Sequence, residues 1–327
     1  MDKNIKIFIN YILGPAFLLW LSWDVYHQIT TEKDIGQQWQ ALQQILSAKG
    51  PIPLILILLL MCFQWMLEAF KWKLLLRDVV SLHWITAFRS ILSGITVSVV
   101  TPNRLGEFAG RIVHLPNGTR LEGTAYTFMG NLAQLIITCL VGGLALYSGY
   151  DQLKIQLNSK DSFYSIDLLL LLSPIVTIAL LLLYFSSNWI MRKLGHWKIL
   201  RVYAGHLLLL AATPRRRLTS VLLLSLLRYG IFIGQYLIVF RFTGVDNPAI
   251  VLAIGVAVML LWLSIVPTFS FMEMGVRWQF ALLLFPAIHT MPLAIPVAVT
   301  IIWLVNFIVP AFIGALVLPG WRFRLPA

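Results

Sequence analysis

Long runs of apolar residues, separated by short polar segments, dominate the sequence. The runs are rich in Leu, Ile and Val, and most reach the roughly 20 residues that an α-helix needs to cross the hydrocarbon core of a bilayer. They lack the alternating segments of about 10 residues that are typical of a membrane β-barrel. The pattern predicts an all-α polytopic membrane protein with spanning helices at 5–26, 51–72, 122–148, 163–186, 218–243 and 289–318.

Two further apolar stretches, 84–101 and 250–266, are shorter, and each runs into a proline. Proline should end these helices, because it lacks an amide donor and its ring clashes with the preceding turn. A short helical segment resumes after each proline. We therefore expect two re-entrant helical hairpins, each of which enters and leaves on one side of the membrane. The residues expected at the two breaks are Pro102, Gly106, Pro267 and Gly275.

The two halves of the chain resemble each other. A shift of the first half by 166 residues superimposes its segments on those of the second half in order, and aligns Glu107 with Glu273 and Arg111 with Arg277. We interpret 1–327 as a single membrane domain with repeat halves 1–160 and 161–327. Each half has three crossings, an odd number, so the halves should form an inverted repeat, which is typical of transporters.

Composition and charge fit this topology. Hydrophobic residues make up 59% of the chain and charged residues only 12%, too few for the surface of a sizeable soluble domain. Of the 25 Lys and Arg residues, 18 lie in five segments. These segments all face the same side of the membrane if neither hairpin crosses it. The positive-inside rule makes that side cytoplasmic. It predicts a multi-pass protein of the inner (plasma) membrane with both termini in the cytoplasm.

The net charge of +12 then needs no nucleic-acid partner, because a basic cytoplasmic face is attracted to anionic lipid. The run Arg215 to Arg217 is expected to be such a lipid anchor. The two cysteines and six histidines show no metal-ligand spacing, and we expect neither a metal nor a cofactor. Most of the twelve tryptophans flank the predicted helices, as residues of aromatic belts do.

Charged residues inside a membrane are costly, so each is a candidate functional residue. Arginine suits an anionic headgroup, because its planar guanidinium can bind phosphate through two hydrogen bonds. The candidate substrate-binding residues are Arg104, Glu107, Arg111, Arg228, Glu273 and Arg277. The glutamates would orient the arginines or bind a coupling proton. The alternative stays open that the two i,i+4 Glu–Arg pairs are internal salt bridges that only fix the hairpins.

Other polar residues in the apolar runs have simpler interpretations. Arg228 lies about ten residues inside its helix and is expected to face a cavity, whereas Arg241 should extend to the membrane surface. Glu68 is near the predicted inner end of its helix and is expected to anchor it at the interface. Asn131 and Gln134 are expected to form hydrogen bonds between helices rather than to contact substrate.

The segment TPNRLGEFAGR resembles the P-x-R-x-G-E-x-x-R motif of the lysylphosphatidylglycerol synthase transmembrane, or flippase-like, family. The matching residues are Pro102, Arg104, Gly106, Glu107 and Arg111. The second hairpin is similar to the family's later motif, a proline and a Ser followed by G-G-x-G-x-R-E, but it departs from it. Met272 and Glu273 replace two glycines, and Trp278 stands where the family has an acid.

The resemblance covers nearly the whole chain and implies a lipid-translocating membrane domain without the soluble aminoacyl-transfer domain of the full synthases. Our hypothesis is a flippase that moves an anionic or lipid-linked headgroup, with a membrane phospholipid or lipid-linked substrate as its partner. The alternatives are a membrane transferase that uses a lipid-linked donor and a non-catalytic membrane subunit. A homodimer or a pathway partner also stays open.

Overall fold

The computed structural model describes residues 35–99, 101, 104–158, 166–186, 213–266, 270–285 and 293–318. Every regular element in these residues is a helix. The long helices are α4 (Ile52–Leu75), α7 (Arg120–Ser148), α9 (Ile166–Phe185) and α12 (Arg215–Phe242). The shorter ones are α3 (Ile35–Lys49), α5 (Trp84–Val99), α6 (Gly106–Ile112), η3 (Asn117–Thr119), α8 (Tyr150–Asn158), α13 (Ala249–Ile265), α14 (Ser270–Leu284), α15 (Ala294–Trp303), η5 (Leu304–Ile308) and α16 (Val309–Val317).

Five of these segments are long and apolar enough to cross a membrane: α4, η3–α7, α9, α12 and α15–η5–α16. Each coincides within a few residues with a predicted span, and the sixth prediction, 5–26, lies outside the described residues. The fifth span contains a single π-helical turn, η5, between α15 and α16. An all-α polytopic membrane protein is therefore confirmed.

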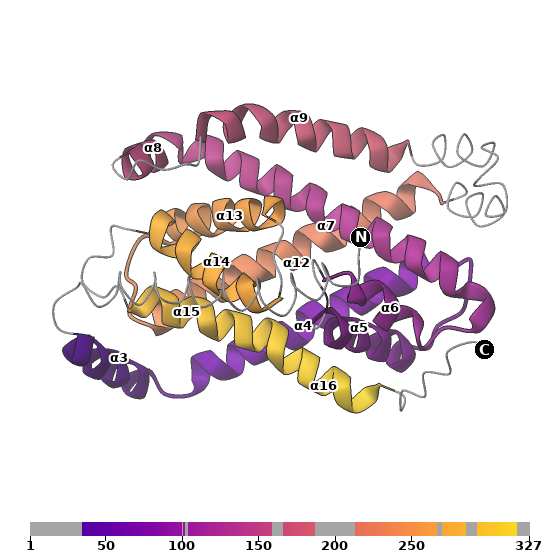
Figure 1. The fold of residues 1–327 in the computed structure, drawn as a ribbon, viewed down its shortest axis with the longest axis horizontal. Helices are drawn as coiled ribbons and strands as arrows, with labels where there is room; N and C mark the ends of the chain where they lie inside the picture. The colour runs from indigo at the N-terminus through magenta and orange to yellow at the C-terminus, as the bar shows by residue number, and fades with distance from the viewer. Residues whose placement is uncertain are drawn as a thin grey trace, which may run out of the picture.

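The two shorter apolar stretches form helices α5 and α13, and each is followed by a separate helix, α6 or α14. Figure 1 shows α5 and α6 at the end of the bundle where α4 stops and α7 starts. It shows α13 and α14 at the opposite end, where α12 stops and α15 starts. The long helices run between these two ends, so the two broken pairs start at opposite ends of the bundle, and α14 contacts α5 between them.

The helix bounds recur along the chain. Adding 166 to the bounds of α4 and α5 gives ranges that coincide, within three residues, with α12 and α13, and the shifted range of α6 falls inside the longer α14. The packing partners follow the same correspondence. Helix α5 of the first half packs on α16 of the second half, and α13 of the second half packs on α7 of the first half. Between these pairs, α4 packs directly against α12.

Glycines in α6 allow its backbone to approach the backbone of α5 closely. A Cβ atom at Gly106 would lie 2.3 Å from the carbonyl oxygen of Val97, and one at Gly110 would lie 2.4 Å from that of Ser93. The four-residue spacing puts both glycines on the same face of α6, as in the small-residue contacts of other membrane helices. The close approach fixes the position of Glu107 and Arg111, which α6 carries between and beyond these glycines.

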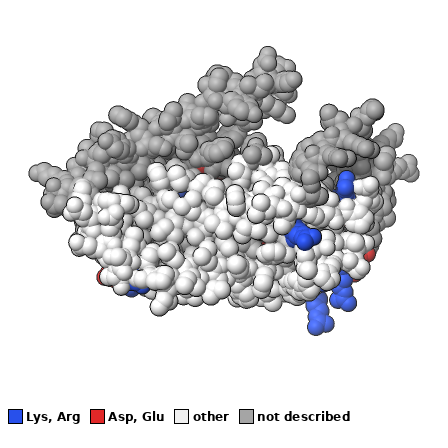
Figure 2. Space-filling model, turned by 90° about the horizontal axis from the view of Figure 1, so that it is seen from below, with Lys and Arg blue, Asp and Glu red and all other residues white. Residues whose placement is uncertain are grey.

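Basic residues gather at one end of the molecule. Figure 2 shows a nearly uncharged face with most of its Lys and Arg residues toward one end. In the run Arg215–Arg217, the first two side chains are exposed, but Arg217 is 11% exposed and pairs with Asp78 at 2.7 Å. Hydrogen bonding to Arg217 lowers the pKa of the Asp78 carboxyl. The prediction that all three arginines anchor lipid is thus wrong for Arg217, which ties the start of α12 to the segment after α4.

Replacing Gly110 with alanine should destabilise the protein, because the new methyl group meets backbone atoms of α5 that cannot move aside. Overpacking of this kind costs about 1–3 kcal/mol. Gly230→Ala is the matched control, since Gly230 is also helical and has no atom within 4 Å of its ideal Cβ position. Thermal unfolding in detergent should show a lower midpoint for Gly110→Ala and an unchanged or higher midpoint for Gly230→Ala. Equal midpoints would contradict the close packing.

Candidate functional site

A buried carboxylate, Glu68, lies at the centre of the first charge cluster. It is 1% exposed on α4, and it pairs with Lys71 at 2.7 Å, Arg111 at 2.9 Å and Arg228 at 3.3 Å. These cations come from α4, α6 and α12, so one carboxylate joins three helices. The prediction that Glu68 anchors its helix at the interface is therefore wrong. Three cations inside the bundle need a buried counterion, and the Glu68 side chain supplies it.

Arg111 is the most buried of the candidate arginines. Its side chain is 2% exposed and pairs with Glu68 and, within α6, with Glu107. The second oxygen of Glu107 accepts a hydrogen bond from Asn131 of α7 at 3.4 Å. Asn131 therefore forms the helix–helix hydrogen bond that the sequence predicted. The guanidinium of Arg111 is engaged by two carboxylates and holds α6 against α4.

The second cluster forms around Glu273, in the first turn of α14. Its carboxylate is 2.6 Å from Arg277 on the same helix. Arg104, which precedes α6, donates to its two oxygens at 2.7 and 2.8 Å. Arg277 also donates to the hydroxyl of Tyr236 at 3.0 Å. Glu273 thus connects the first broken helix pair to the second.

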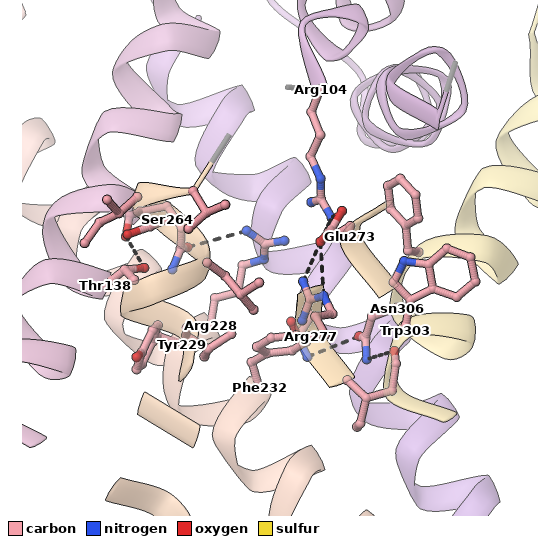
Figure 3. A pocket seen from close by; sticks show the side chains of 18 of the residues that line it. Arg104, Thr138, Arg228, Tyr229, Phe232, Ser264, Glu273, Arg277, Trp303 and Asn306 are labelled. Carbon is pink, nitrogen blue, oxygen red and sulfur yellow. Dashed lines mark hydrogen bonds and ion pairs between the residues drawn. The ribbon is translucent and has the colours of Figure 1, made fainter. Parts of the chain in front are cut away.

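Arg104 has an unusual backbone conformation. Its φ of 57° makes it the one non-glycine residue with positive φ among the described residues. Such a conformation is strained for an L-residue and costs roughly 1 kcal/mol or more. The guanidinium packs over the ring of Phe307 at 4.6 Å, a cation–π contact. The contacts with Glu273 and Phe307 offset this cost and direct the side chain away from its own hairpin (Figure 3).

Both clusters adjoin a cavity of about 580 Å³. Its wall contains Arg104, Arg228, Glu273 and Arg277 together with aromatic and amide side chains (Figure 3). A smaller cavity of about 260 Å³ shares part of this wall and reaches Glu107 and Asn131. The described residues that line both cavities are Trp65, Arg104, Gln134, Thr138, Arg228, Ser264 and Phe307. Arg228 donates to Gln134 at 3.4 Å and lies over the ring of Trp65.

The site carries more positive than negative charge. The two clusters contain five cations, Lys71, Arg104, Arg111, Arg228 and Arg277, against three carboxylates, Glu68, Glu107 and Glu273. The difference is two positive charges in an apolar bundle. Such an excess is costly inside a membrane and is reduced when an anion binds.

The arginines differ in how far their side chains are exposed and in whether they line the cavity. The side chain of Arg104 is 42% exposed and that of Arg228 is 21% exposed, and both line the cavity. Arg277 lines it too, but its side chain is 10% exposed and most of its donors are engaged. Arg111 lines neither cavity. The i,i+4 pairs therefore exist as salt bridges, while Arg104 and Arg228 have donor groups that a bound molecule could contact.

The predicted break residues lie in different places. Pro102 and Pro267 fall outside the described residues, although α5 ends before the first and α13 before the second. Gly106 is the first residue of α6. Gly275 was expected at the second break but lies inside α14, which begins at Ser270. A single glycine costs a helix only about 1 kcal/mol, so it does not end α14 here.

Two groups of residues in and beside the cavity were missed by the sequence analysis. Gln64, Glu68 and Lys71 recur at a spacing of four and then three residues, which places them on one face of α4. That polar stripe in an apolar helix was a usable signal. Trp65 and Trp303, which the sequence analysis did not single out among the tryptophans, both line the cavity. Their position depends on packing between distant helices, which the sequence does not reveal.

Arg241 behaves as expected for a residue at the end of a helix. Its side chain is 49% exposed and pairs with Asp246 beyond the end of α12. No group of three or more His, Cys, Asp and Glu residues that could hold a metal occurs in the described part of the chain.

A family model described as the lysylphosphatidylglycerol synthase TM region matches residues 7–314. The chain therefore belongs to this family, a membrane domain of lipid-related proteins. Comparisons with curated proteins and with solved structures gave no match.

Replacing Glu68 with glutamine should strongly destabilise the protein, because Lys71, Arg111 and Arg228 would lose their shared carboxylate. Removing one partner of a buried ion pair costs about 3–5 kcal/mol. Asp78→Asn is the control, since the Asp78 side chain is 51% exposed and such a pair contributes about 1 kcal/mol or less. Unfolding midpoints in detergent compare the two variants. A Glu68→Gln midpoint equal to that of Asp78→Asn would contradict a central role for Glu68.

Proposed function

We propose that this member of the lysylphosphatidylglycerol synthase TM-region family is a lipid flippase. It moves an anionic or lipid-linked headgroup across the inner membrane through the cavity between its two broken helix pairs. The observation that carries the proposal is an excess of positive charge around a cavity inside a bundle of apolar helices. The described long helices expose many large apolar side chains to their surroundings, as helices in contact with lipid do.

The chemistry of the cavity supports an anionic substrate. Arg104 and Arg228 approach it from different helices, and both are partly exposed there. A phosphate group could accept hydrogen bonds from both guanidinium groups at once. Because each arginine now contacts a carboxylate that also has other cationic partners, either arginine can turn to a ligand without leaving that carboxylate unpaired.

The arrangement of the helices supports movement of the substrate between two sides. The broken pair α5–α6 lies at one end of the bundle and α13–α14 at the other (Figure 1). The helix bounds recur at an offset of 166 residues, and the two halves exchange their packing partners. These features favour an inverted repeat with two re-entrant hairpins, in which rocking of the halves opens the cavity to each side in turn.

The distribution of charge supports an orientation. The end that contains the start of α12 carries Lys and Arg residues (Figure 2), and the positive-inside rule assigns it to the cytoplasm. We propose that α5–α6 opens toward the cytoplasm and α13–α14 toward the opposite side. The termini of the chain would then both be cytoplasmic.

Alanine at Arg104 or Arg228 should slow transbilayer movement of a fluorescent anionic phospholipid at least tenfold in liposomes that contain the purified protein. Both variants should fold, because Glu273 retains Arg277 and Glu68 retains Lys71 and Arg111. The movement is measured by dithionite quenching of the lipid that reaches the outer leaflet.

The matched control is Arg241→Ala, which removes an arginine from the same helix as Arg228 but far from the cavity wall. It should transport as the unmodified protein does. If Arg104→Ala and Arg228→Ala also transport at the unmodified rate, the mechanism is wrong. Turnover of a labelled lipid donor by the purified protein, without movement of lipid, would favour a transferase instead.

A further inference from the structure

Three nitrogen donors that belong to residues lining the cavity have no hydrogen-bond partner among the described residues. They are the indole Nε1 atoms of Trp65 and Trp303 and the Nε atom of Arg228, all buried. Trp65 is 9% exposed, so its N–H group is almost completely removed from solvent. An unpaired buried donor costs about 1–3 kcal/mol, and a ligand with acceptor oxygens removes this cost.

The carboxylates around the cavity are already paired. Glu273 contacts Arg104 and Arg277, and Glu68 contacts three cations. Glu107 is held by Arg111 and Asn131. Within the described residues, none of these three acids is free to bind an ammonium group. An amine on the headgroup would also meet Arg104, Arg228 and Arg277 on the same wall, and like charges repel strongly at low dielectric.

The remaining polar groups on the wall are neutral. Gln64, Gln134 and Asn306 supply amides, and Thr138 and Ser264 supply hydroxyl groups. Gln64 donates to Gln235 and lies 3.5 Å from the side-chain oxygen of Asn306, which is carried by the π-helical turn η5. Amides and hydroxyls both donate and accept, so they suit hydroxyl groups of a ligand. The volume of about 580 Å³ lies in the range of sites that hold small molecules, roughly 300–1,000 Å³.

From these contacts we infer the substrate class, an inference that rests on the proposed function. The cavity selects a lipid phosphate whose remaining headgroup is uncharged and rich in oxygen, as in a polyol or sugar phospholipid. It discriminates against headgroups that carry an amine, including aminoacylated ones. Arg104 and Arg228 bind the phosphate, and the indole N–H groups of Trp65 and Trp303 donate to the neutral oxygens of the headgroup.

The first experiment compares three phospholipids with the same labelled acyl chains in liposomes that contain the protein. Phosphatidylglycerol carries a phosphate and free hydroxyl groups. Phosphatidylethanolamine has an amine in place of these hydroxyl groups, and lysyl-phosphatidylglycerol carries two amines on its glycerol. Phosphatidylglycerol should cross at least tenfold faster than either amine lipid. If all three cross at equal rates, or an amine lipid crosses fastest, the specificity is overturned while the proposed flippase function stands.

Trp65→Phe and Trp303→Phe test the two indole donors, because each keeps an aromatic ring and removes the N–H group. Each should slow the transbilayer movement of phosphatidylglycerol by about fivefold, the effect of one lost hydrogen bond. The rates for the two amine lipids should not change. Trp84→Phe is the control, since Trp84 is 47% exposed and does not line the cavity. Equal slowing of all three lipids by the cavity variants would contradict a role in selecting the headgroup.

A binding measurement separates the two proposals if no lipid moves. Dihexanoyl phosphatidylglycerol should raise the thermal unfolding midpoint of the detergent-solubilised protein, because a ligand that binds the folded state stabilises it. Dihexanoyl phosphatidylethanolamine should not raise it, and Trp303→Phe should reduce the shift that phosphatidylglycerol gives. A short-chain prenyl phosphate hexose, tested in parallel, distinguishes a sugar-lipid source from a phospholipid. Equal stabilisation by the amine lipid overturns the inference, and selective binding without transport overturns only the flippase function.

Discussion

The cost of placing charge inside hydrocarbon is the constraint on which this structure depends. Glu68 and Glu273 each bring cations from different helices to one carboxylate, and in this way they tie the long helices to the broken pairs. A buried ion pair adds little stability over an apolar contact, but a broken one is severely destabilising. The two clusters therefore specify how the helices assemble. Their cations outnumber their carboxylates, and this excess positive charge favours an anionic ligand.

The structure divides the charged residues into two kinds by depth. Arg111 is almost fully buried between two carboxylates and fixes α6 against α4. Arg104 and Arg228 are only partly buried and line the cavity. The structural interpretation thus holds for Arg111, while ligand binding stays a prediction for Arg104 and Arg228. One side of the cluster is therefore buried and paired, and the other side borders the cavity.

Local patterns in the sequence predicted the spans, the two interrupted helices and the i,i+4 Glu–Arg pairs, because each depends on residues close together in the chain. The role of Glu68 was missed, since its partners Arg111 and Arg228 lie 43 and 160 positions away. The contact of Arg104 with Glu273, and the interior positions of Trp65 and Trp303, arise from packing between the two halves. Periodicity along one helix carries no information on which distant helix it will face.

The most direct test of this account is a structure of the protein in a nanodisc that contains an anionic phospholipid, with a rigid binding protein added as a marker for image alignment. The account predicts density for a phosphate within hydrogen-bonding distance of both Arg104 and Arg228, with the headgroup in the cavity beside Trp303. The contradicting result is a cavity that holds only acyl chain or water, with Arg104 still paired to Glu273 and Arg228 to Glu68.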